Sequence, residues 1–419
     1  LILNDCQLYA NNAPQHGGAI QANGAELSIT RVHFANNHAG QDGGAIFSEG
    51  FLEIDRSTLR DNSSGREGGA VYSAGSASDK LAFSLLASSV INNAAAVGGG
   101  AIFTTSPGLM EIVNSTLQGN RANSGGGIQM SSVAELINVT VAENDASEKG
   151  GGIEISSSGV LTLSNTIVAL NTTLNGPPDL SLDPSGTIAP ESATNLIGRN
   201  DSVELHCEET DPLVGTSANP LDPVLNPLDK NGGPTLTMVP ASGSPAIDSG
   251  TPTDFAGGTD QRELPRLANG DGENDAEIDL GAAEAGLAIL VNTTADEDDE
   301  EPGPQTSLRE AIALAETPGT RIVFDEVIFD GEADDVITLD PENGSLEIAD
   351  RNLSIDASNI RDSSQKVVGV TLSGGEALRV MRVGSLSTIT LNTLTIKEGR
   401  ASGASTAENS GGGIYNDGT

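Results

Sequence analysis

Apolar and polar residues alternate in short runs that recur along the first 171 residues of the chain. Examples are LSITRVHFANN at 27–37, LEIDRSTLRDN at 52–62 and MEIVNSTLQGN at 110–120. Alternation with a period of two and many β-branched residues is typical of β-strands that bury one face. The pattern therefore predicts a series of short strands in this part of the chain.

A second motif, two glycines followed by an aliphatic residue, recurs once in each unit of this pattern. The aliphatic residues are 26, 25, 31, 26 and 25 positions apart; they are Ile20, Ile46, Val71, Ile102, Ile128 and Ile153. An asparagine comes eight or nine residues before each of them, in turn Asn12, Asn37, Asn62, Asn93, Asn120 and Asn144. A fixed period of this size predicts a solenoid in which each repeat forms one coil.

We expect this solenoid to be a right-handed parallel β-helix, an all-β fold with one short capping helix. Each coil supplies two or three strands that stack on the next coil at ~4.8 Å. The glycine pairs permit the backbone of a tight corner, while the asparagines tolerate left-handed geometry and can bond to their copies in neighbouring coils. A β-sandwich with glycine-rich turns is the alternative, but a sandwich has no reason to keep these residues in phase.

The repeat pattern ends after LTLSNTIVALN at 161–171, and the composition of the sequence changes there. Prolines and glycines become frequent, and six successive acidic residues follow from Asp296 to Glu301. We therefore expect four parts: coils over 1–171, a C-terminal segment of this helix over 172–286, an acidic linker over 287–305, and a second β-helical part over 306–419.

A helix is predicted in the stretch TSLREAIALAETPGT, at about 306–316. Ser307 and Glu310 have the spacing of a capping box, and Leu308 and Ile312 share one helical face. Beyond it, strand-like runs such as STITLNTLTIKEG resume and lead into a last GGGIYNDGT. The helix is therefore expected to cap the open end of the second β-helical part.

Three stretches resemble known families. The GGAI and FANN repeats resemble the Gly-Gly-Ala-Ile and Phe-x-x-Asn repeats of chlamydial polymorphic outer-membrane adhesins, with the phenylalanine present at Phe34. NGGPT, GSPAID, TDQRELPR and IDLGAAE, between 231 and 284, resemble the choice-of-anchor Q domain of bacterial secreted proteins. TSLREAIALA resembles the CSLREA domain, with Thr306 in place of its cysteine. These resemblances imply an extracellular or cell-surface β-helix protein and carry no catalytic residue over to this chain.

The charge of the chain narrows its partners. Its formal net charge is −39, with 59 Asp and Glu against 20 Lys and Arg among 419 residues. An acidic surface does not bind nucleic acid, because phosphate contacts need a basic face. No apolar run approaches the length of a transmembrane helix, and the two cysteines, Cys6 and Cys207, are too few for a disulfide framework.

The order of the parts suggests a partner for the chain in further copies of itself. If Thr419 is joined to Leu1, Ile414 precedes Leu1 by six positions, as Ile46 precedes Leu52. We therefore predict an extracellular structural protein, one unit of a fibre of head-to-tail β-helices. The units would be tandem in one chain or docked end to end, and a fragment joining two different β-helices stays open.

A cell-surface adhesin, with cell-surface glycans or proteins as partners, is the alternative function. An enzyme is not expected, and a polysaccharide lyase or hydrolase is the least favoured reading. Sugar clefts rely on aromatic platforms, but the chain has no tryptophan and only Tyr9, Tyr72 and Tyr415. Its four histidines form no metal-spaced pair, and we expect them at the surface; they are His16, His33, His38 and His206.

Calcium is the one cofactor that the sequence suggests. The stretch NGDGENDAEID at 269–279 places acidic residues at alternate positions; they are Asp271, Glu273, Asp275, Glu277 and Asp279. Several oxygen ligands on a flexible loop suit a hard cation. A solvated acidic loop without a bound ion is the alternative.

Several asparagines have the Asn-x-Ser/Thr spacing of glycosylation acceptors. They are Asn62, Asn114, Asn138, Asn171 and Asn292. Those that lie on outward turns are expected to be the modified ones. In a chain this rich in Asn, Ser and Thr, the same spacing also arises by chance.

Overall fold

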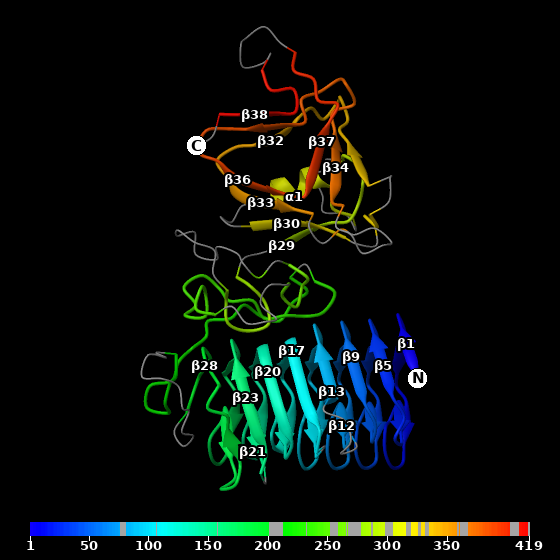
Figure 1. The fold of residues 1–419 in the computed structure, drawn as a ribbon, viewed down its shortest axis with the longest axis vertical. Helices are drawn as coiled ribbons and strands as arrows, with labels where there is room; N and C mark the ends of the chain where they lie inside the picture. Colours follow the sequence, from blue (N-terminus) through cyan, green and yellow to red (C-terminus); the bar gives the residue numbers. More distant parts are fainter. Residues whose placement is uncertain are drawn as a thin grey trace. The chain divides into compact units, whose positions relative to one another are not determined.

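The computed structural model divides the chain into two compact units, Leu1–Ala285 and Gly286–Thr419. Figure 1 shows short strands in both of them. The described residues are 1–75, 81–105, 107–156, 158–200, 213–231, 233–251, 259–264, 266, 278–285, 288–297, 305–315, 320–325, 328–331, 335–357, 360, 368–402 and 410–417. Within these ranges no helix is both long enough and apolar enough to span a membrane.

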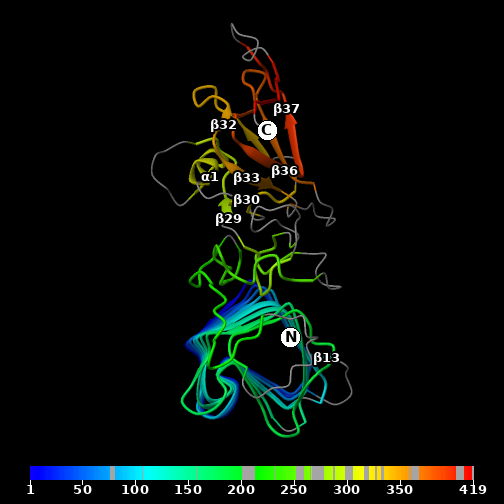
Figure 2. The ribbon, with the colours of Figure 1, turned by 90° about the vertical axis from the view of Figure 1, so that its left-hand side faces the viewer.

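The first unit is a parallel β-helix, which confirms the predicted all-β parallel solenoid. Its coils superpose when viewed along the direction in which they stack (Figure 2). The largest sheet has two rows of strands, joined where β17 (Leu109–Gln118) and β20 (Val133–Ala142) run through both. One row is β1 (Ile2–Asn4), β5 (Leu27–Thr30), β9 (Leu52–Asp55), β13 (Leu81–Leu86), β23 (Val160–Ser164) and β27 (Thr187–Ile188). The other is β2 (Gln7–Tyr9), β6 (His33–Ala35), β10 (Thr58–Arg60), β14 (Ser89–Ile91), β24 (Ile167–Ala169) and β28 (Leu196–Ile197).

Two smaller sheets complete each coil. The asparagine sheet, named for the residues beside it, is β3 (Asn12–Ala13), β7 (His38–Ala39), β11 (Ser63–Ser64), β15 (Ala94–Ala95), β18 (Arg121–Ser124), β21 (Asp145–Lys149) and β25 (Thr172–Thr173). The glycine sheet, which follows the glycine pairs, is β4 (Ile20–Ala22), β8 (Ile46–Ser48), β12 (Val71–Ser73), β16 (Ile102–Thr104), β19 (Ile128–Met130), β22 (Ile153–Ile155) and β26 (Leu180–Leu182).

The repeated aliphatic residues form one ladder inside the glycine sheet. Val71 pairs in register with Ile46 on one side and Ile102 on the other, and all three side chains are fully buried. Burying one such side chain stabilises the fold by roughly 1.5–3 kcal/mol. Because stacked aliphatic residues fill the interior, this core needs few aromatic rings; Phe34 and Phe83 lie within it.

Each coil turns at corners where one residue adopts a left-handed backbone. In the second coil these residues are Arg31, Asn36 and Gly43, with φ of 52°, 57° and 68°. A left-handed conformation costs an ordinary residue roughly 1–2 kcal/mol. The ladder of backbone hydrogen bonds offsets this cost, because it continues through the corners: Arg31 N–H donates to Asp55 O at 3.0 Å.

The third corner requires both glycines, for two different reasons. Gly43 has a positive φ of 68°, and a Cβ on it would lie 2.3 Å from the carbonyl oxygen of Ile46 in its own coil. Gly44 has ordinary dihedrals, but its Cβ would lie 2.0 Å from the carbonyl oxygen of Gly69 in the next coil. The Gly-Gly pair is therefore a turn residue followed by a residue on which the next coil packs directly.

The second corner carries the predicted asparagine ladder. The backbone N–H and the side-chain Nδ2 of Asn37 both donate to Oδ1 of Asn62, at 3.0 and 2.9 Å. The same pair of bonds continues through Asn93, Asn120, Asn144 and Asn171.

Two details of the predicted ladder were wrong. In the first coil Asn11 makes the bonds to Asn37, whereas Asn12 lies in β3. The left-handed residue is the one before the ladder asparagine, as Asn36 is before Asn37. The ladder side chain faces inward, so that its amide can bond along the stack.

Coil strands also continue past residue 171, beyond the predicted end of the regular repeats. β25, β26, β27 and β28 pair in parallel with β21, β22, β23 and β24. Leu180 takes the place of Ile153 in the buried ladder, although no glycine pair precedes it. The coil therefore continues after the Gly-Gly pattern has ended. An inward apolar residue such as Leu180 is enough to keep the strand in register.

The second unit is a shorter set of parallel strands with its own hydrophobic core. Phe324 and Phe329 meet edge to face inside it, with ring centroids 5.1 Å apart. One sheet is β29 (Ala288–Val291), β30 (Thr320–Phe324), β33 (Asn352–Asp356) and β36 (Thr388–Asn392); a second is β31 (Val336–Thr338), β34 (Val370–Ser373) and β37 (Leu394–Lys397); the third is β32 (Leu346–Ile348), β35 (Met381–Val383) and β38 (Ile414–Asn416).

Helix α1 (Leu308–Leu314) is the only helix within the described ranges. Its capping box is present, since Ser307 Oγ accepts from Glu310 N–H at 3.1 Å and Glu310 Oε2 accepts from Ser307 N–H at 2.7 Å. The helix packs against β29 and β30. The preceding residues were expected to be a linker, but 288–291 form a strand and Asp296 pairs with Arg309 at 2.8 Å, so they belong to the second unit.

Candidate functional site

The outer face of the β6–β24 row is covered along most of its length by a segment of the same unit, the described residues of 213–251, 259–266 and 278–285, which we call the cover. Thr116 Oγ1 donates to Gln261 Oε1 at 2.6 Å, and Arg56 Nη1 lies 3.0 Å from Glu263 Oε1. The described contacts of the cover begin at Arg56, in the corner before β10, and continue over later coils, but they do not extend to β2. The outward side chains of the first coils are therefore open to solvent.

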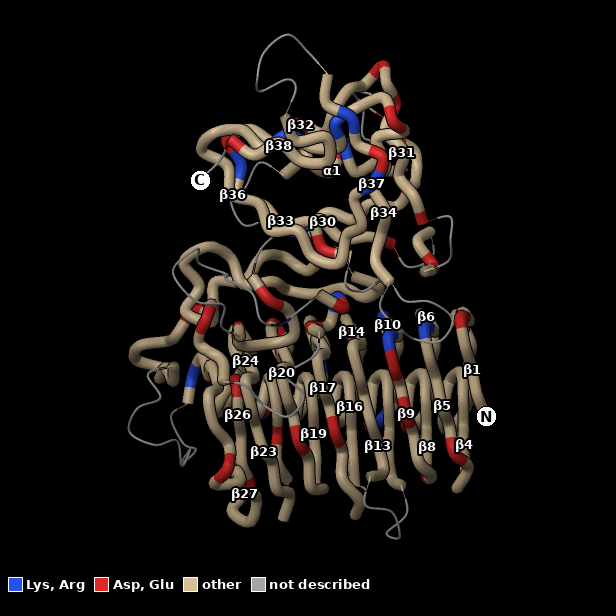
Figure 3. Tube along the Cα trace, turned by 45° about the horizontal axis from the view of Figure 1, so that its top comes forward, with Lys and Arg blue, Asp and Glu red and all other residues tan. Residues whose placement is uncertain are grey.

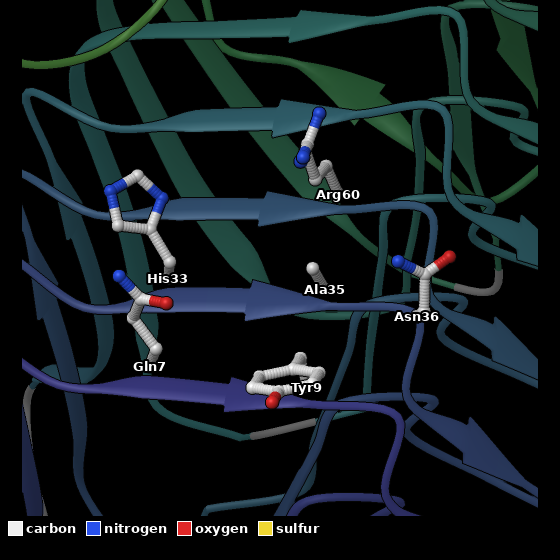
Figure 4. A pocket seen from close by; sticks show the side chains of 6 residues that line it. All are labelled: Gln7, Tyr9, His33, Ala35, Asn36 and Arg60. Carbon is white, nitrogen blue, oxygen red and sulfur yellow. The ribbon is translucent and has the colours of Figure 1, made fainter.

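A polar hollow of about 400 Å³ lies on these first coils (Figure 4). Its floor and walls come from three successive strands, β2, β6 and β10, and from the corner after β6. The lining residues are Gln7, Tyr9, His33, Ala35, Asn36 and Arg60. A hollow of this volume falls in the range of small-molecule sites, although it is open rather than enclosed.

The strand register explains how these side chains come together. Tyr9, Ala35 and Arg60 are paired across β2, β6 and β10, so they form one row on the outer face. Neighbouring strands lie ~4.8 Å apart, which puts the backbones of Tyr9 and Arg60 about 10 Å apart. The methyl group of Ala35 lies between them, and its small size opens the space (Figure 4).

The second row of the hollow is Gln7 and His33, also paired across β2 and β6. His33 keeps an exposed edge, yet desolvation by its surroundings lowers its pKa below the ordinary value, and the positive charges of Arg60 and Lys230 lower it further. The imidazole is therefore uncharged at neutral pH, with one nitrogen to donate and one to accept.

The hollow contains a cation that is only weakly paired. The nearest carboxylate to Arg60 is that of Asp61, at 4.0 Å, and both side chains are exposed. Exposed pairs of this kind contribute little binding energy, so the guanidinium remains available. Figure 3 shows acidic positions spread over the chain and a basic position at β10, the strand that contains Arg60. The hollow is thus a local positive site on an acidic protein.

A second cluster of charges is buried between the coils and the cover. Arg262 pairs with Asp260 at 2.7 Å and Arg266 pairs with Glu284 at 2.8 Å, with all four side chains 0–1% exposed. Arg266 also donates to Oδ1 of Asn114 on β17, at 2.6 Å.

The pKa values in this cluster follow from burial and from the two arginines. Burial raises the pKa of Glu284 well above its ordinary value. Burial acts in the same direction on Asp260, but Arg262 and Arg266 outweigh it and hold that pKa below its usual range. Since none of these groups is exposed, the cluster fastens residues 259–264, Arg266 and residues 278–285 to the coils and offers no surface to a ligand.

A stack of rings on the outer face of the glycine sheet is also structural. Phe47 and Tyr72 stack at 4.9 Å, and Tyr72 and Phe103 at 5.4 Å, with His16 at 4.6 Å from Phe47. Their ring faces are turned toward one another. A sugar packs on the face of a ring, so this ladder leaves no free platform between its members.

The predicted calcium ligands are only partly visible. Asp271, Glu273, Asp275 and Glu277 lie outside the described residues. Asp279 is buried and accepts backbone N–H groups from Asp248 and Ala285. Among the described residues no three His, Cys, Asp or Glu side chains are grouped as a metal site. Calcium therefore remains a prediction from the sequence.

Three of the five predicted glycosylation acceptors have buried side chains. Asn62 and Asn171 belong to the asparagine ladder, and Asn138 is completely buried in β20. A glycan has no access to these amides in the folded coils, so these three do not belong to the outward acceptors that are expected to be modified. Asn114 and Asn292 are partly exposed, and their modification stays a prediction.

The hollow is not among the sites predicted from the sequence, although the spacing of its residues is visible there. Tyr9, Ala35 and Arg60 are 26 and 25 positions apart, which is the period of the coil. Any residues at that spacing share a row on the surface. In the sequence, the small number of tyrosines argues against a sugar cleft. A single exposed ring, that of Tyr9, is nevertheless enough to serve as a platform for one sugar.

Comparison with known proteins gives one match. Residues 31–49 match the Chlamydia polymorphic membrane protein repeat. This stretch begins before β6, ends after β8, and includes His33, Ala35 and Asn36 of the hollow. No curated protein and no solved structure matches the chain. The match supports one of the three resemblances, and the choice-of-anchor Q and CSLREA resemblances stay predictions.

Proposed function

We propose that the protein is a cell-surface, adhesin-like β-helix that binds its partner through the polar hollow on β2, β6 and β10. The observation that carries the proposal is the position of the matched repeat. It supplies β6 and the following corner, and these form the middle of the hollow. The name of that repeat refers to a membrane protein, which favours a surface location for this chain.

Binding fits the hollow better than catalysis does. Its lining residues include an aromatic ring, two amides, an imidazole and a guanidinium, but no carboxylate. Hydrolysis of a glycosidic bond ordinarily uses a pair of carboxyl groups on either side of that bond, and the hollow has none. The side chains of the hollow are held in place by rigid strands, and recognition of a ligand requires such a preformed arrangement.

Two measurements test this function. Antibody labelling and protease treatment of intact producing cells should find the protein at the surface, and the purified, labelled chain should bind target cells in a saturable way. Binding should fall when unlabelled protein competes. A protein found only inside the producing cell, or binding that never saturates, would refute the proposal.

A fibre of end-to-end β-helices is the second candidate function. The observation that favours it is that β1 and β36 each pair on one side only, and Ile2 on β1 is 71% exposed. Unpaired parallel edges invite addition of a further strand. We propose that these edges stack on another coil, of the same chain or of a neighbouring copy.

Mass measurement and microscopy decide this candidate. In denaturant with reducing agent, a species at a multiple of 42.6 kDa would support tandem units in one chain. A species at 42.6 kDa that forms filaments in electron micrographs would support docking of separate copies. The same mass with no filaments at high protein concentration would exclude the fibre.

A further inference from the structure

We infer that the hollow on β2, β6 and β10 binds a carboxylate-bearing sugar, of the uronic or sialic acid class, as part of a surface glycan. The inference rests on the proposed adhesin-like function and adds the class of ligand. It depends on three features of the hollow: the spacing of Tyr9 and Arg60, the local charge, and a middle strand, β6, that is paired on both sides.

The spacing suits one pyranose ring held between an aromatic wall and a cation. Tyr9 is 68% exposed, so its ring can accept the apolar face of a sugar. Arg60 is two strands away in the same row, and Ala35 leaves the space between them unfilled. A sugar in contact with Tyr9 and lying over Ala35 directs its carboxylate toward the Arg60 guanidinium.

The charge of the hollow selects an anionic ligand. Arg60 and Lys230 are the charged groups that act on His33, and both are positive. Arg60 has five donors in a planar fork, which matches the two oxygens of a carboxylate. Because the chain as a whole carries −39, an anionic glycan is repelled elsewhere and is attracted only where such cations gather.

The remaining groups suit sugar hydroxyls. Gln7 and Asn36 place amides at the rim, and each amide can donate and accept (Figure 4). The neutral imidazole of His33 lies beside Gln7 in the second row and can do the same. Hydroxyl groups of a pyranose are both donors and acceptors, so these three side chains fix its orientation without any added charge.

A peptide ligand fits this surface less well. Extended peptides usually bind by adding a strand to a free sheet edge. The middle strand β6 is paired on both sides, with β2 and with β10, so its backbone groups are already used. Over this middle strand the hollow can contact a ligand only through side chains, which suits a compact sugar, whereas β2 at the end of the sheet is the strand that keeps a free edge.

Binding of defined glycans by the full-length protein tests the inference. The probes are 3′-sialyllactose and tri-galacturonic acid, with lactose and methyl-esterified tri-galacturonate as neutral counterparts. We expect at least one acid to bind, and its neutral counterpart to bind about tenfold more weakly or worse, because a charge-assisted bond is lost. The sugar that binds identifies which of the two classes is recognised.

Three variants locate the binding site. Arg60→Gln removes the cation, Tyr9→Leu removes the flat ring, and Ala35→Leu fills the floor while leaving every polar group in place. The matched control is Arg121→Gln, which removes an exposed cation from β18 on another sheet. We expect about tenfold weaker binding from Arg60→Gln, a loss with Ala35→Leu, and wild-type affinity for Arg121→Gln.

Several outcomes would overturn the inference without touching the proposed function. The hollow does not recognise the carboxylate if the acid and its neutral counterpart bind equally well. The same conclusion follows if Arg60→Gln and Arg121→Gln have equal effects on binding. If the Ala35→Leu variant still binds cells, the partner binds elsewhere on the protein. If acidic peptides alone inhibit cell binding, the partner is a protein. If the wild-type protein is not found at the cell surface and does not bind cells, the adhesin-like function itself is rejected.

Discussion

Asn171 donates its side-chain amide to Oδ1 of Asp179 at 2.8 Å, in the position where each earlier coil supplies an asparagine. The backbone N–H of Asn171 donates to the same oxygen at 3.2 Å, and Arg199 N–H donates to Oδ2 at 2.7 Å. Asp179 therefore ends the asparagine ladder with a buried carboxyl group. Burial raises its pKa from 3.8 to about 6, despite the hydrogen bonds from Asn171 and Arg199 that lower it.

The first prediction is that Asp179 makes the fold less stable as the pH rises. The folded pKa lies above the unfolded value, so the folded state holds the proton more tightly. Its stabilising effect is complete below about pH 4 and is lost as the pH rises through about 6. The shift corresponds to about 3 kcal/mol at most. A ¹³C carboxyl NMR titration should give a midpoint near 6.

Denaturation of Asp179→Asn between pH 4 and 7 checks the same assignment through stability. The variant loses the acceptor for Arg199, so its stability falls overall, but its dependence on pH in this window should be flatter than that of the wild type. Asp145→Asn, which alters a carboxylate in an exposed ion pair, is the control and should keep the wild-type slope. An unchanged slope in Asp179→Asn would contradict the prediction.

The second prediction concerns a ladder residue in the middle of the stack. Oδ1 of Asn93 accepts two bonds from Asn62, and its Nδ2 donates to Leu59 O and Asn120 Oδ1. Asn93→Ala leaves buried donors and an acceptor without partners, which should cost about 2–4 kcal/mol of unfolding free energy. Asn123→Ala removes an exposed amide that accepts from Ser147 and should change stability by less than about 0.5 kcal/mol. Urea denaturation of both variants measures the difference.

The third prediction separates the two reasons for glycine. Gly44→Ala puts a methyl group 2.0 Å from the Gly69 carbonyl oxygen, so the coils must move apart at a cost of about 3 kcal/mol or more. Gly24 has a φ of 69° but nothing within 4 Å of its Cβ position. Gly24→Ala should therefore cost only the left-handed conformation, about 1 kcal/mol. Similar melting temperatures for the two variants would refute this distinction.

The fourth prediction compares two asparagines with the same backbone. Asn114 and Asn138 have φ of 47° and 54° in the middle of β17 and β20. Asn114 bonds to Arg266 and Thr259, whereas both side-chain polar atoms of Asn138 are buried without a partner. Glycine tolerates this backbone, so Asn138→Gly should be neutral or stabilising.

Asn114→Gly is the matched counterpart to Asn138→Gly. It takes an acceptor away from the fully buried Arg266 guanidinium, and it should destabilise the protein by about 2–4 kcal/mol. Thermal unfolding monitored by circular dichroism compares the two glycine variants with the wild type. If both variants unfold together, the contact between Asn114 and Arg266 contributes nothing to stability.

The coil could be predicted because its signals are local and repeated. Gly43 and Gly44 mark a steric requirement that the first six coils meet in the same way, and Ile46 marks an inward position. The asparagine of the first coil was misplaced by one residue, since Asn11 and Asn12 are adjacent and only the inward one bonds to Asn37. A period fixes which residues stack, but it does not say which of two neighbours faces the core.

The cover and the hollow could not be predicted in the same way. Asn114 and Arg266 are 152 positions apart, and nothing in their local sequence indicates that they meet. Asn62 and Asn171 have the spacing of glycosylation acceptors, yet the requirements of the ladder bury them. The hollow depends on where the cover stops, which is a property of the packed unit and not of any motif.

The nearest-neighbour bonding of the coils also determines how the first unit responds to force. The backbone bonds and the asparagine ladder run along the stack, so a pull in that direction loads one layer at a time. When a terminal coil is released, about 25 residues become available, or roughly 80 Å of extended chain. The next coil then bears the load with its own ladder bonds intact. Such a structure lengthens in steps under tension and limits the force that reaches whatever it holds.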